Sequence, residues 1–256
     1  MHWTQSLRHS ADGGRFWQLL VDLSTLLLAA GATCVDLPVD DQVTLFGDMC
    51  DRDCPTLYLR QIYGALFPQI MAYLKNEFGG AVILIGNPGI GKTRFMMYTI
   101  IRAATEGWKS IVVDAPALFG NRLFVIEPYG VGEKNRNDFK VQKSSLYLFD
   151  AAGDHKDRAL PATHTVIFSS PDVKGYKTAV KADRRKLFVV PPFSFEEVQS
   201  LKATEYFAGR ENVDELFSIY GGIPRVVFCQ ESPDVHRGYV RRMLSQAIED
   251  KRFYGE

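Results

Sequence analysis

Residues 81–93, AVILIGNPGIGKT, decide how the rest of the chain is interpreted. The apolar run 81–85 has the composition of a buried strand, and residues 86–93 match G-x-x-x-x-G-K-[ST] at every fixed position. A helix-like stretch, 94–104, follows directly. Strand, glycine-rich loop and helix form the setting that this phosphate-binding motif requires. A glycine-rich turn without a ligand would have to match every fixed position and both flanks by chance.

The residue types of the loop suit a nucleotide and its metal ion. Glycines let the backbone curl so that successive N–H groups face phosphate oxygens, and the following helix N-terminus favours negative charge. We expect Lys92 to reach the β- and γ-phosphates and the Thr93 hydroxyl to bind Mg²⁺. ATP is favoured over GTP because residues 133–138, EKNRND, do not match the guanine-reading N-K-x-D. The predicted nucleotide-binding residues are Gly86, Asn87, Pro88, Gly89, Ile90, Gly91, Lys92, Thr93 and Arg94.

Composition excludes several other classes of protein. The 256 residues carry 30 basic and 30 acidic side chains, so no overall positive field attracts nucleic acid. The four cysteines and five histidines have no zinc-site spacing, which favours a reduced, intracellular protein. The first dozen residues are polar, unlike a secretory signal, and the apolar stretch 19–35 is too short for a membrane span. We therefore expect no membrane partner.

The apolar spacing predicts strands that alternate with helices, which implies a parallel sheet covered by helices. The predicted fold class is an α/β P-loop NTPase, AAA/STAND-like and of the additional-strand type, with a three-layer parallel sheet and a C-terminal helical lid. The predicted domains are an N-terminal helical extension (1–55), a P-loop ATPase core (56–192) and the lid (193–256). The predicted strands are 81–85, 110–114, 145–150, 165–169 and 187–190, with a hairpin formed by 123–127 and 138–142. The predicted helices are 15–30, 57–77, 94–104, 194–207, 213–220 and 237–248.

A second acidic element follows the loop by about sixty residues. Ser145-Leu146-Tyr147-Leu148-Phe149-Asp150 is an apolar strand ending in an acid, so Asp150 is predicted to hold Mg²⁺ together with Thr93. The alternative is an acid that only ends a buried strand. Many ATPases of this class carry a glutamate directly after this acid as the base for water, whereas Ala151 and Ala152 follow here, which weakens the case for fast hydrolysis. The acids left open as substitutes are Glu127, Glu133 and Asp154.

Ser169 ends the next predicted strand, beside the expected γ-phosphate. It is predicted to sense phosphate or orient water, because open α/β sheets bind ligands at the carboxyl ends of their strands. A plain turn after the strand is the equal alternative.

A basic run precedes the 187–190 strand. In oligomeric ATPases of the AAA type an arginine finger occupies this position, so Arg184 or Arg185 is predicted to reach the γ-phosphate of a neighbour in a homo-oligomer. A nucleic-acid patch and a solvated helix face remain open. The basic residues are Lys174, Lys177, Lys181, Arg184, Arg185 and Lys186.

Gly221-Gly222-Ile223-Pro224-Arg225 predicts a sharp entry into a lid helix. Arg225, just inside that helix, is predicted to report the nucleotide state, and an exposed arginine on a structural turn is the alternative. The predicted catalytic residues are Lys92, Asp150, Ser169 and Arg225.

Several segments together resemble a known group. LYLRQIY (57–63), GNPGIGKT (86–93), FSSPDVKGYKTAVK (168–181), PPFSFEEV (191–198) and YGGIPRVVF (220–228) occur in this order. The set resembles the P-loop ATPase domain of Crinkler effectors and the related retrotransposon hot spot proteins, over about residues 55–230.

The resemblance implies an AAA/STAND-like ATPase, often nuclear and commonly fused to a nuclease. It implies phosphate and metal contacts for Lys92, Thr93 and Asp150, a lid sensor in Arg225, and Arg60 and Tyr63 near the base or ribose. The family's translocation header is not recognisable in residues 1–50, and no nuclease fits after the lid. Host-cell delivery and DNA cleavage are therefore not expected. We expect instead a stand-alone ATPase module or a truncated copy.

The sequence as a whole predicts a Mg²⁺-dependent ATPase of slow turnover in the nucleus or cytoplasm, with its lid or oligomer responding to nucleotide. A nucleotide-gated interaction protein that hydrolyses little, a P-loop small-molecule kinase and an inactive, element-derived protein are the alternatives. The sequence does not identify a protein or nucleic-acid partner.

Overall fold

The computed structural model describes residues 13–28, 34–37, 45, 49, 56–76, 80–151, 164–171, 185–204 and 207–228. The chain divides into two compact units, Met1–Pro191 and Pro192–Glu256. Each unit is described by itself. Among the described residues, no helix is long and apolar enough to cross a membrane.

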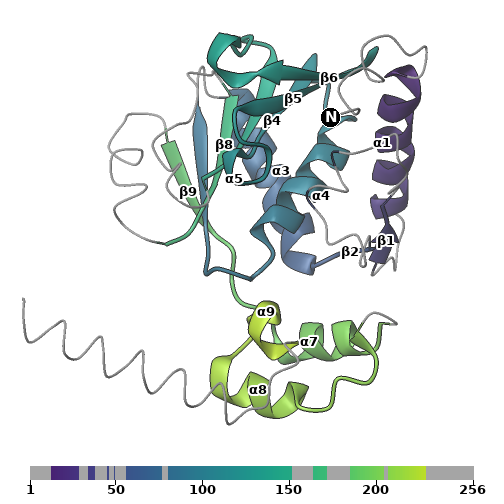
Figure 1. Ribbon diagram of the computed structural model, residues 1–256, viewed down its shortest axis with the longest axis vertical. Coiled ribbons are helices and arrows are strands. Elements are labelled where there is room, and N and C mark those ends of the chain that lie inside the picture. Colours follow the sequence, from purple (N-terminus) through teal and green to yellow (C-terminus); the bar gives the residue numbers. More distant parts are fainter. Residues whose placement is uncertain are drawn as a thin grey trace, which may run out of the picture. The chain divides into compact units, whose positions relative to one another are not determined.

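A seven-stranded sheet forms the centre of the first unit (Figure 1). Its order is β6-β5-β4-β7-β8-β3-β9, and β4, β7, β8, β3 and β9 run parallel. Because β8 lies between β3 and β7, this is the P-loop NTPase fold of the additional-strand type. The hairpin β5–β6 extends the sheet antiparallel beside β4. The strands are β3 (Ala81–Ile85), β4 (Ser110–Asp114), β5 (Arg122–Glu127), β6 (Gly130–Asn135), β7 (Ser145–Asp150), β8 (His164–Ser169) and β9 (Arg185–Val189).

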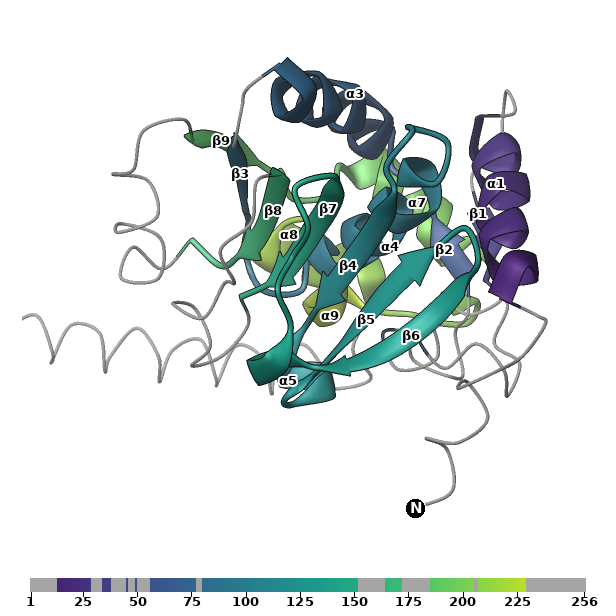
Figure 2. The ribbon, with the colours of Figure 1, turned by 90° about the horizontal axis from the view of Figure 1, so that it is seen from above.

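The long helices α3 (Gln61–Asn76) and α4 (Lys92–Ala103) lie on one face of this sheet (Figure 2). Helix α1 (Gly13–Leu28) packs beside α4, where the Ser24 and Thr105 hydroxyls lie 3.3 Å apart. Strands β1 (Cys34–Asp36) and β2 (Thr56–Tyr58) pair antiparallel in a separate two-stranded sheet. Helix α5 (Pro116–Phe119) follows β4, and the 3-10 helix η1 (Arg136–Asp138) follows β6.

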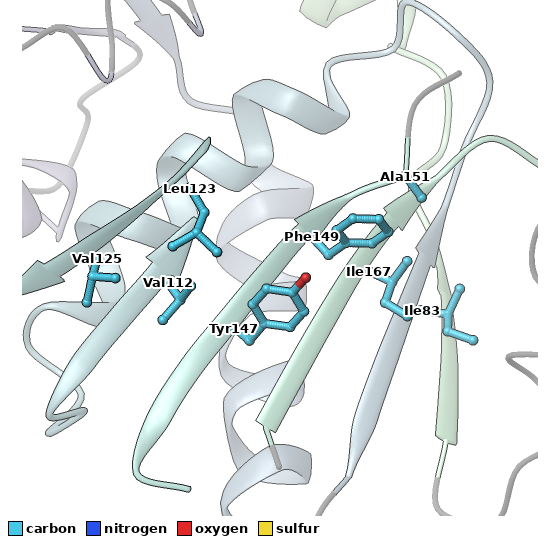
Figure 3. Close-up of a cluster of buried hydrophobic side chains, with 8 residues drawn as sticks. All are labelled: Ile83, Val112, Leu123, Val125, Tyr147, Phe149, Ala151 and Ile167. Atoms are coloured by element: carbon cyan, nitrogen blue, oxygen red, sulfur yellow. The ribbon is translucent and has the colours of Figure 1, made fainter. Parts of the chain in front are cut away.

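Successive side chains along each strand point to opposite faces of the sheet, so each face carries every second residue. On the α4 side, Phe168 of β8 meets the ring of Phe95 edge-on. The opposite face carries a buried cluster that crosses the sheet (Figure 3). Residues Phe139 and Val141, from the segment after η1, pack against that cluster. The cluster consists of Ile83, Val112, Leu123, Val125, Tyr147, Phe149, Ala151 and Ile167.

The second unit contains α7 (Phe195–Lys202), α8 (Val213–Tyr220) and α9 (Pro224–Val227). Helix α7 begins with a capping box, in which Ser194 and Glu197 satisfy each other's backbone N–H groups. Hydrogen bonds from its own backbone N–H and from Ser194 lower the pKa of Glu196. Gly221, with φ of 66°, ends α8.

Two sequence predictions of local structure are wrong. The second hairpin strand is Gly130–Asn135, not 138–142, because two glycines and charged residues hide its pattern. The alternating Phe139 and Val141 cover the core without forming a strand. Helix α3 begins at Gln61, since Leu57 and Tyr58 belong to β2. The predicted helix 237–248 lies outside the described residues.

Candidate nucleotide site

The phosphate loop, residues 86–93, joins β3 to α4 with a backbone that requires glycine. Gly89 and Gly91 have φ values of 84° and 91°, in the left-handed region that L side chains rarely adopt. Gly91 is the N-cap of α4, and its carbonyl accepts the first helical hydrogen bond, from Phe95 N. The N-terminus of α4 therefore begins directly at the loop, where a helix N-terminus attracts anions.

Gly86 is required for a different reason, the close approach of its neighbours. A Cβ atom at this position would lie 2.3 Å from Ile90 Cδ1 and 3.1 Å from Val190 O. Ile90 is fully buried and folds back over Gly86, while Gly86 N donates to Ser169 O at 3.3 Å. The loop is therefore packed onto the ends of β8 and β9.

The Lys92 ammonium group lies across the loop. Lys92 Nζ donates to Gly86 O at 2.7 Å and to Asn87 O at 3.0 Å. An ammonium group has three donor hydrogens and no acceptor, so it can hold loop carbonyls and anionic oxygens. Arg94, in the first turn of α4, contacts the carbonyl of Thr56 at 3.5 Å, which directs it toward β2.

The next residue, Thr93, meets Asp150 at the carboxyl end of β7. Thr93 Oγ1 donates to Asp150 Oδ2 at 3.2 Å. A hydroxyl and a carboxylate at this separation supply the hard oxygen ligands that Mg²⁺ prefers, and water and phosphate oxygens ordinarily complete such a shell. The donor set fits Mg²⁺. Elsewhere among the described residues, no group of three or more His, Cys, Asp or Glu side chains could hold a metal ion.

Two buried side chains, Arg60 just before α3 and Tyr63 in its first turn, contact the backbone of the phosphate loop. Tyr63 is 1% exposed, stacks on Phe95 with ring centroids 4.8 Å apart, and donates its hydroxyl to Gly91 O at 2.9 Å. Arg60 is 3% exposed and contacts Ile90 O and Pro191 O. Both residues lie under the loop backbone, so we assign them to loop support, although the resemblance placed them near the base or ribose.

A buried charge network that sequence reasoning missed lies on the next strand. Asp114 ends β4 and is fully buried, and the Arg136 Nε–H is shared between its two carboxylate oxygens at 3.1 and 2.9 Å. The Tyr147 hydroxyl donates to the same carboxylate, and the Arg136 guanidinium lies 5.9 Å from the Phe149 ring centroid. Asp114 pairs with Phe149 in the ladder, and successive side chains alternate between faces, so Asp114 faces away from Asp150.

The acids proposed as the hydrolytic base do not gather at the site. Glu127 pairs with Gly130 at the far end of the hairpin from the carboxyl edge of β4. Glu133 lies on β6, where it forms an ion pair with Arg122 of β5. Strand β6 is three strands, or roughly 14 Å, from β7 in the sheet. Asp154 lies outside the described residues.

The remaining predicted residues are dispersed. Ser169 is buried at the end of β8, but its hydroxyl donates to Ser170 O at 3.1 Å and its neighbour Phe168 occupies the α4 side. The structure does not bring the Ser169 hydroxyl to the Thr93–Asp150 pair. Arg185 is exposed at the amino end of β9, beside Ala81, and Arg184 lies outside the described residues. Arg225 is exposed in the short helix α9 of the second unit.

A cavity of about 340 Å³ lies elsewhere in the first unit. It lies between the β5–β6 hairpin and the amino ends of β4 and β7, lined in part by Glu127, Lys134, Phe139 and the hydrogen-bonded pair Ser110 and Ser145. The amino ends of these strands are opposite to the edge that carries the phosphate loop, so the cavity is not part of the nucleotide site.

Comparisons with known proteins do not assign this chain to a family. No family model and no curated protein matches the sequence. One similar solved structure is the RuvB Holliday junction branch migration motor of Thermotoga maritima, at 12% sequence identity and a TM-score of 0.35. The match covers 66% of this chain and 59% of that chain. Another is the structure of Drosophila ORC bound to DNA, at 13% sequence identity and a TM-score of 0.37. That match covers 84% of this chain and 66% of that chain.

The chain thus spans under two thirds of the length of either matched chain, and scores this low do not establish a relationship. The strand order, the glycine-rich loop before α4 and the Thr93–Asp150 pair define the class by themselves. The protein is a P-loop nucleotide-binding module of the additional-strand type.

Proposed function

We propose that this protein is a Mg²⁺-dependent ATPase of slow turnover whose second unit acts as a nucleotide-responsive lid. The proposal depends chiefly on the 3.2 Å contact between Thr93 Oγ1 and Asp150 Oδ2, directly beside Lys92 at the start of α4. A phosphate loop, a lysine and two oxygen ligands in one place match the demands of a nucleoside triphosphate and its metal ion.

Each residue of this group has a separate task. The loop N–H groups and the α4 N-terminus bind phosphate oxygens, and Lys92 exchanges its bonds to Gly86 O and Asn87 O for bonds to the β- and γ-phosphates. Thr93 and Asp150 would hold Mg²⁺, which neutralises charge that develops on the phosphates during transfer. Among the described residues no second acid shares this face beside Asp150, which supports slow turnover.

Phosphate release from ATP with Mg²⁺ tests the proposal. Turnover should be lost in Lys92→Ala and Asp150→Ala, and nucleotide affinity should be lost in Lys92→Ala. Lys75→Ala and Glu133→Gln are matched controls, because each removes one charge from an ion pair away from the loop. Wild-type affinity in Lys92→Ala would refute the phosphate-loop assignment.

A second candidate function is a nucleotide-gated interaction protein that binds ATP and hydrolyses little. Ala151 stands where related ATPases carry the base, it is buried, and Asp114 on the neighbouring strand is occupied by Arg136 and Tyr147. Tight ATP binding without steady-state phosphate release would favour this function. A screen of small-molecule acceptors tests the remaining candidate, a P-loop kinase.

Three further assignments belong to the same proposal. Arg225 senses the nucleotide state from the second unit, and Arg184 or Arg185 acts as an arginine finger toward a neighbouring copy. From the ordered motifs we also infer that the chain is related to the ATPase domains of Crinkler and retrotransposon hot spot proteins. Sedimentation with and without ATP tests the oligomer, since loss of ATP-dependent assembly or turnover in Arg185→Ala would support the finger.

A further inference from the structure

The buried arginine Arg60 joins the phosphate loop to the peptide that leaves the first unit. Its Nη1 lies 3.0 Å from Pro191 O and 3.5 Å from Ile90 O, and the residue is 3% exposed. Ile90 belongs to the loop, and Pro191 is the last residue of the first unit. One guanidinium nitrogen therefore lies between two backbone carbonyls from distant parts of the chain.

The carbonyl that Arg60 contacts is part of the phosphate-binding machinery. In a trans peptide the C=O of one residue and the N–H of the next are held in one plane and point in opposite directions. The peptide that presents Ile90 O to Arg60 therefore carries Gly91 N–H on its other side. A phosphate that draws Gly91 N–H also moves Ile90 O.

The exit peptide is packed on the loop at a second place. Val190 N donates to Ile85 O at 2.8 Å, which continues the ladder between β9 and β3. The Val190 carbonyl also packs closely against the backbone of Gly86, because an added Cβ at Gly86 would lie 3.1 Å from that oxygen. The loop and residues 190–191 are thus one packed group.

On the other side of Pro192, the second unit has its own fixed point. Phe193 N donates to Gly222 O at 2.8 Å, and a Cβ atom on Gly222 would lie 1.7 Å from Phe193 O. Gly222 therefore packs its bare backbone on Phe193, three residues before Arg225. Between the carbonyl that Arg60 binds and this fixed point stands Pro192, whose ring fixes φ and restricts the residue before it. Pro192 is thus the single residue between the last residue of the first unit and Phe193.

We propose that Arg60 is a positioning residue that couples the phosphate loop to the second unit, so that nucleotide binding at the loop changes the environment of the Gly221–Arg225 turn. The inference rests on the proposed function, since it needs a nucleotide at the loop. The guanidinium group suits the task because its Nη1 carries two N–H donors in a fixed plane, one for each carbonyl.

Hydrogen exchange of the full chain, with and without a non-hydrolysable ATP analogue and Mg²⁺, tests this coupling. In the wild type the analogue should slow exchange at the loop amides, residues 89–95, and change it about tenfold at Phe193 and residues 221–226, within the range of linked sites. In Arg60→Met the loop should keep its response and the turn should lose it. Arg60→Lys, which keeps the charge and can reach one carbonyl, should restore part of the response.

Arg102→Met is the matched control, because Arg102 is a second inward-facing arginine, 5.0 Å from the Phe67 ring centroid and bonded to Tyr98 OH, remote from the loop. It should leave both responses intact. A Gly-Ser insertion between Pro192 and Phe193 gives a second route that leaves Arg60 unchanged, and it too should abolish the response of the turn alone.

The outcomes separate the two proposals. A wild type without protection at the loop would overturn the proposed function and the coupling with it. Loop protection without any change at the turn would overturn the coupling alone. A turn that still responds in Arg60→Met or in the insertion variant would do the same, as would loss of the loop response in Arg60→Met, which would assign Arg60 to nucleotide binding.

Discussion

Removing the cation from the Asp114 network should be among the most damaging single substitutions in the first unit. Asp114 is fully buried, and Arg136, whose side chain is 11% exposed, neutralises it through an Nε–H shared between both carboxylate oxygens. Arg136→Met keeps the length of the side chain but removes the cation, while the Tyr147 hydroxyl still donates to the buried carboxylate. Breaking one partner of a buried ion pair costs about 3–5 kcal/mol.

Urea unfolding followed by circular dichroism measures this cost. With an m value near 2 kcal/mol per molar urea, the midpoint should fall by about 1.5–2.5 M. The triple variant Asp114→Leu, Arg136→Met, Tyr147→Phe removes the charge and its partners together, so it should be more stable than Arg136→Met alone. Arg122→Met is the control, because its ion pair with Glu133 is exposed and should cost at most about 1 kcal/mol. A loss below about 1 kcal/mol in Arg136→Met would refute the reasoning.

Three other predictions concern the loop and the second unit. Tyr63→Phe removes one bond to Gly91 O, which still accepts from Phe95 N, so ATP affinity measured by titration should fall by no more than about fivefold, or about 1 kcal/mol. Gly222→Ala should destabilise the second unit by about 2–4 kcal/mol in thermal unfolding, because the methyl group meets backbone atoms. Gly221→Ala, strained by φ of 66° but with open space, should cost only about 1–2 kcal/mol, and equal costs would contradict the close approach. Arg225→Ala should leave the melting temperature unchanged and slow phosphate release, whereas unchanged kinetics would remove its sensor role.

The parts of the fold that were predictable from sequence are those with a strong local pattern. Strands β3, β4 and β7 are continuous apolar runs because helices or core segments bury both of their faces, and all three have the predicted bounds. Strand β6 was not predictable, because Gly130, Gly132 and its exposed charges give no alternation. Its pairing with β5 supplies the stability that its composition lacks.

The candidate site also contains residues that were predictable from sequence and residues that were not. Lys92 and Thr93 were predicted because the phosphate loop is a short, contiguous motif. The structure brings Thr93 to Asp150, and their shared role toward Mg²⁺ stays a prediction. The Asp114–Arg136 pair gave no sequence signal, since it depends on β4 lying next to β7 and on η1 returning across the sheet. Arg60 likewise has no motif of its own, and its contacts exist only because β9 ends beside the loop.

The alternation of side chains along β7 and β4 bears directly on hydrolysis. Asp150 and its neighbour Phe149 face opposite sides of the sheet, and Asp114 shares the side of Phe149, where Arg136 and Tyr147 occupy both carboxylate oxygens. The second carboxylate at this edge is therefore used for stability and is turned away from the metal pair. If the protein hydrolyses ATP, the group that activates water must come from a residue other than Asp114, Glu127 or Glu133, either from this chain or from a neighbouring copy. Turnover that rises with protein concentration would favour the neighbouring copy, and turnover independent of concentration would favour this chain.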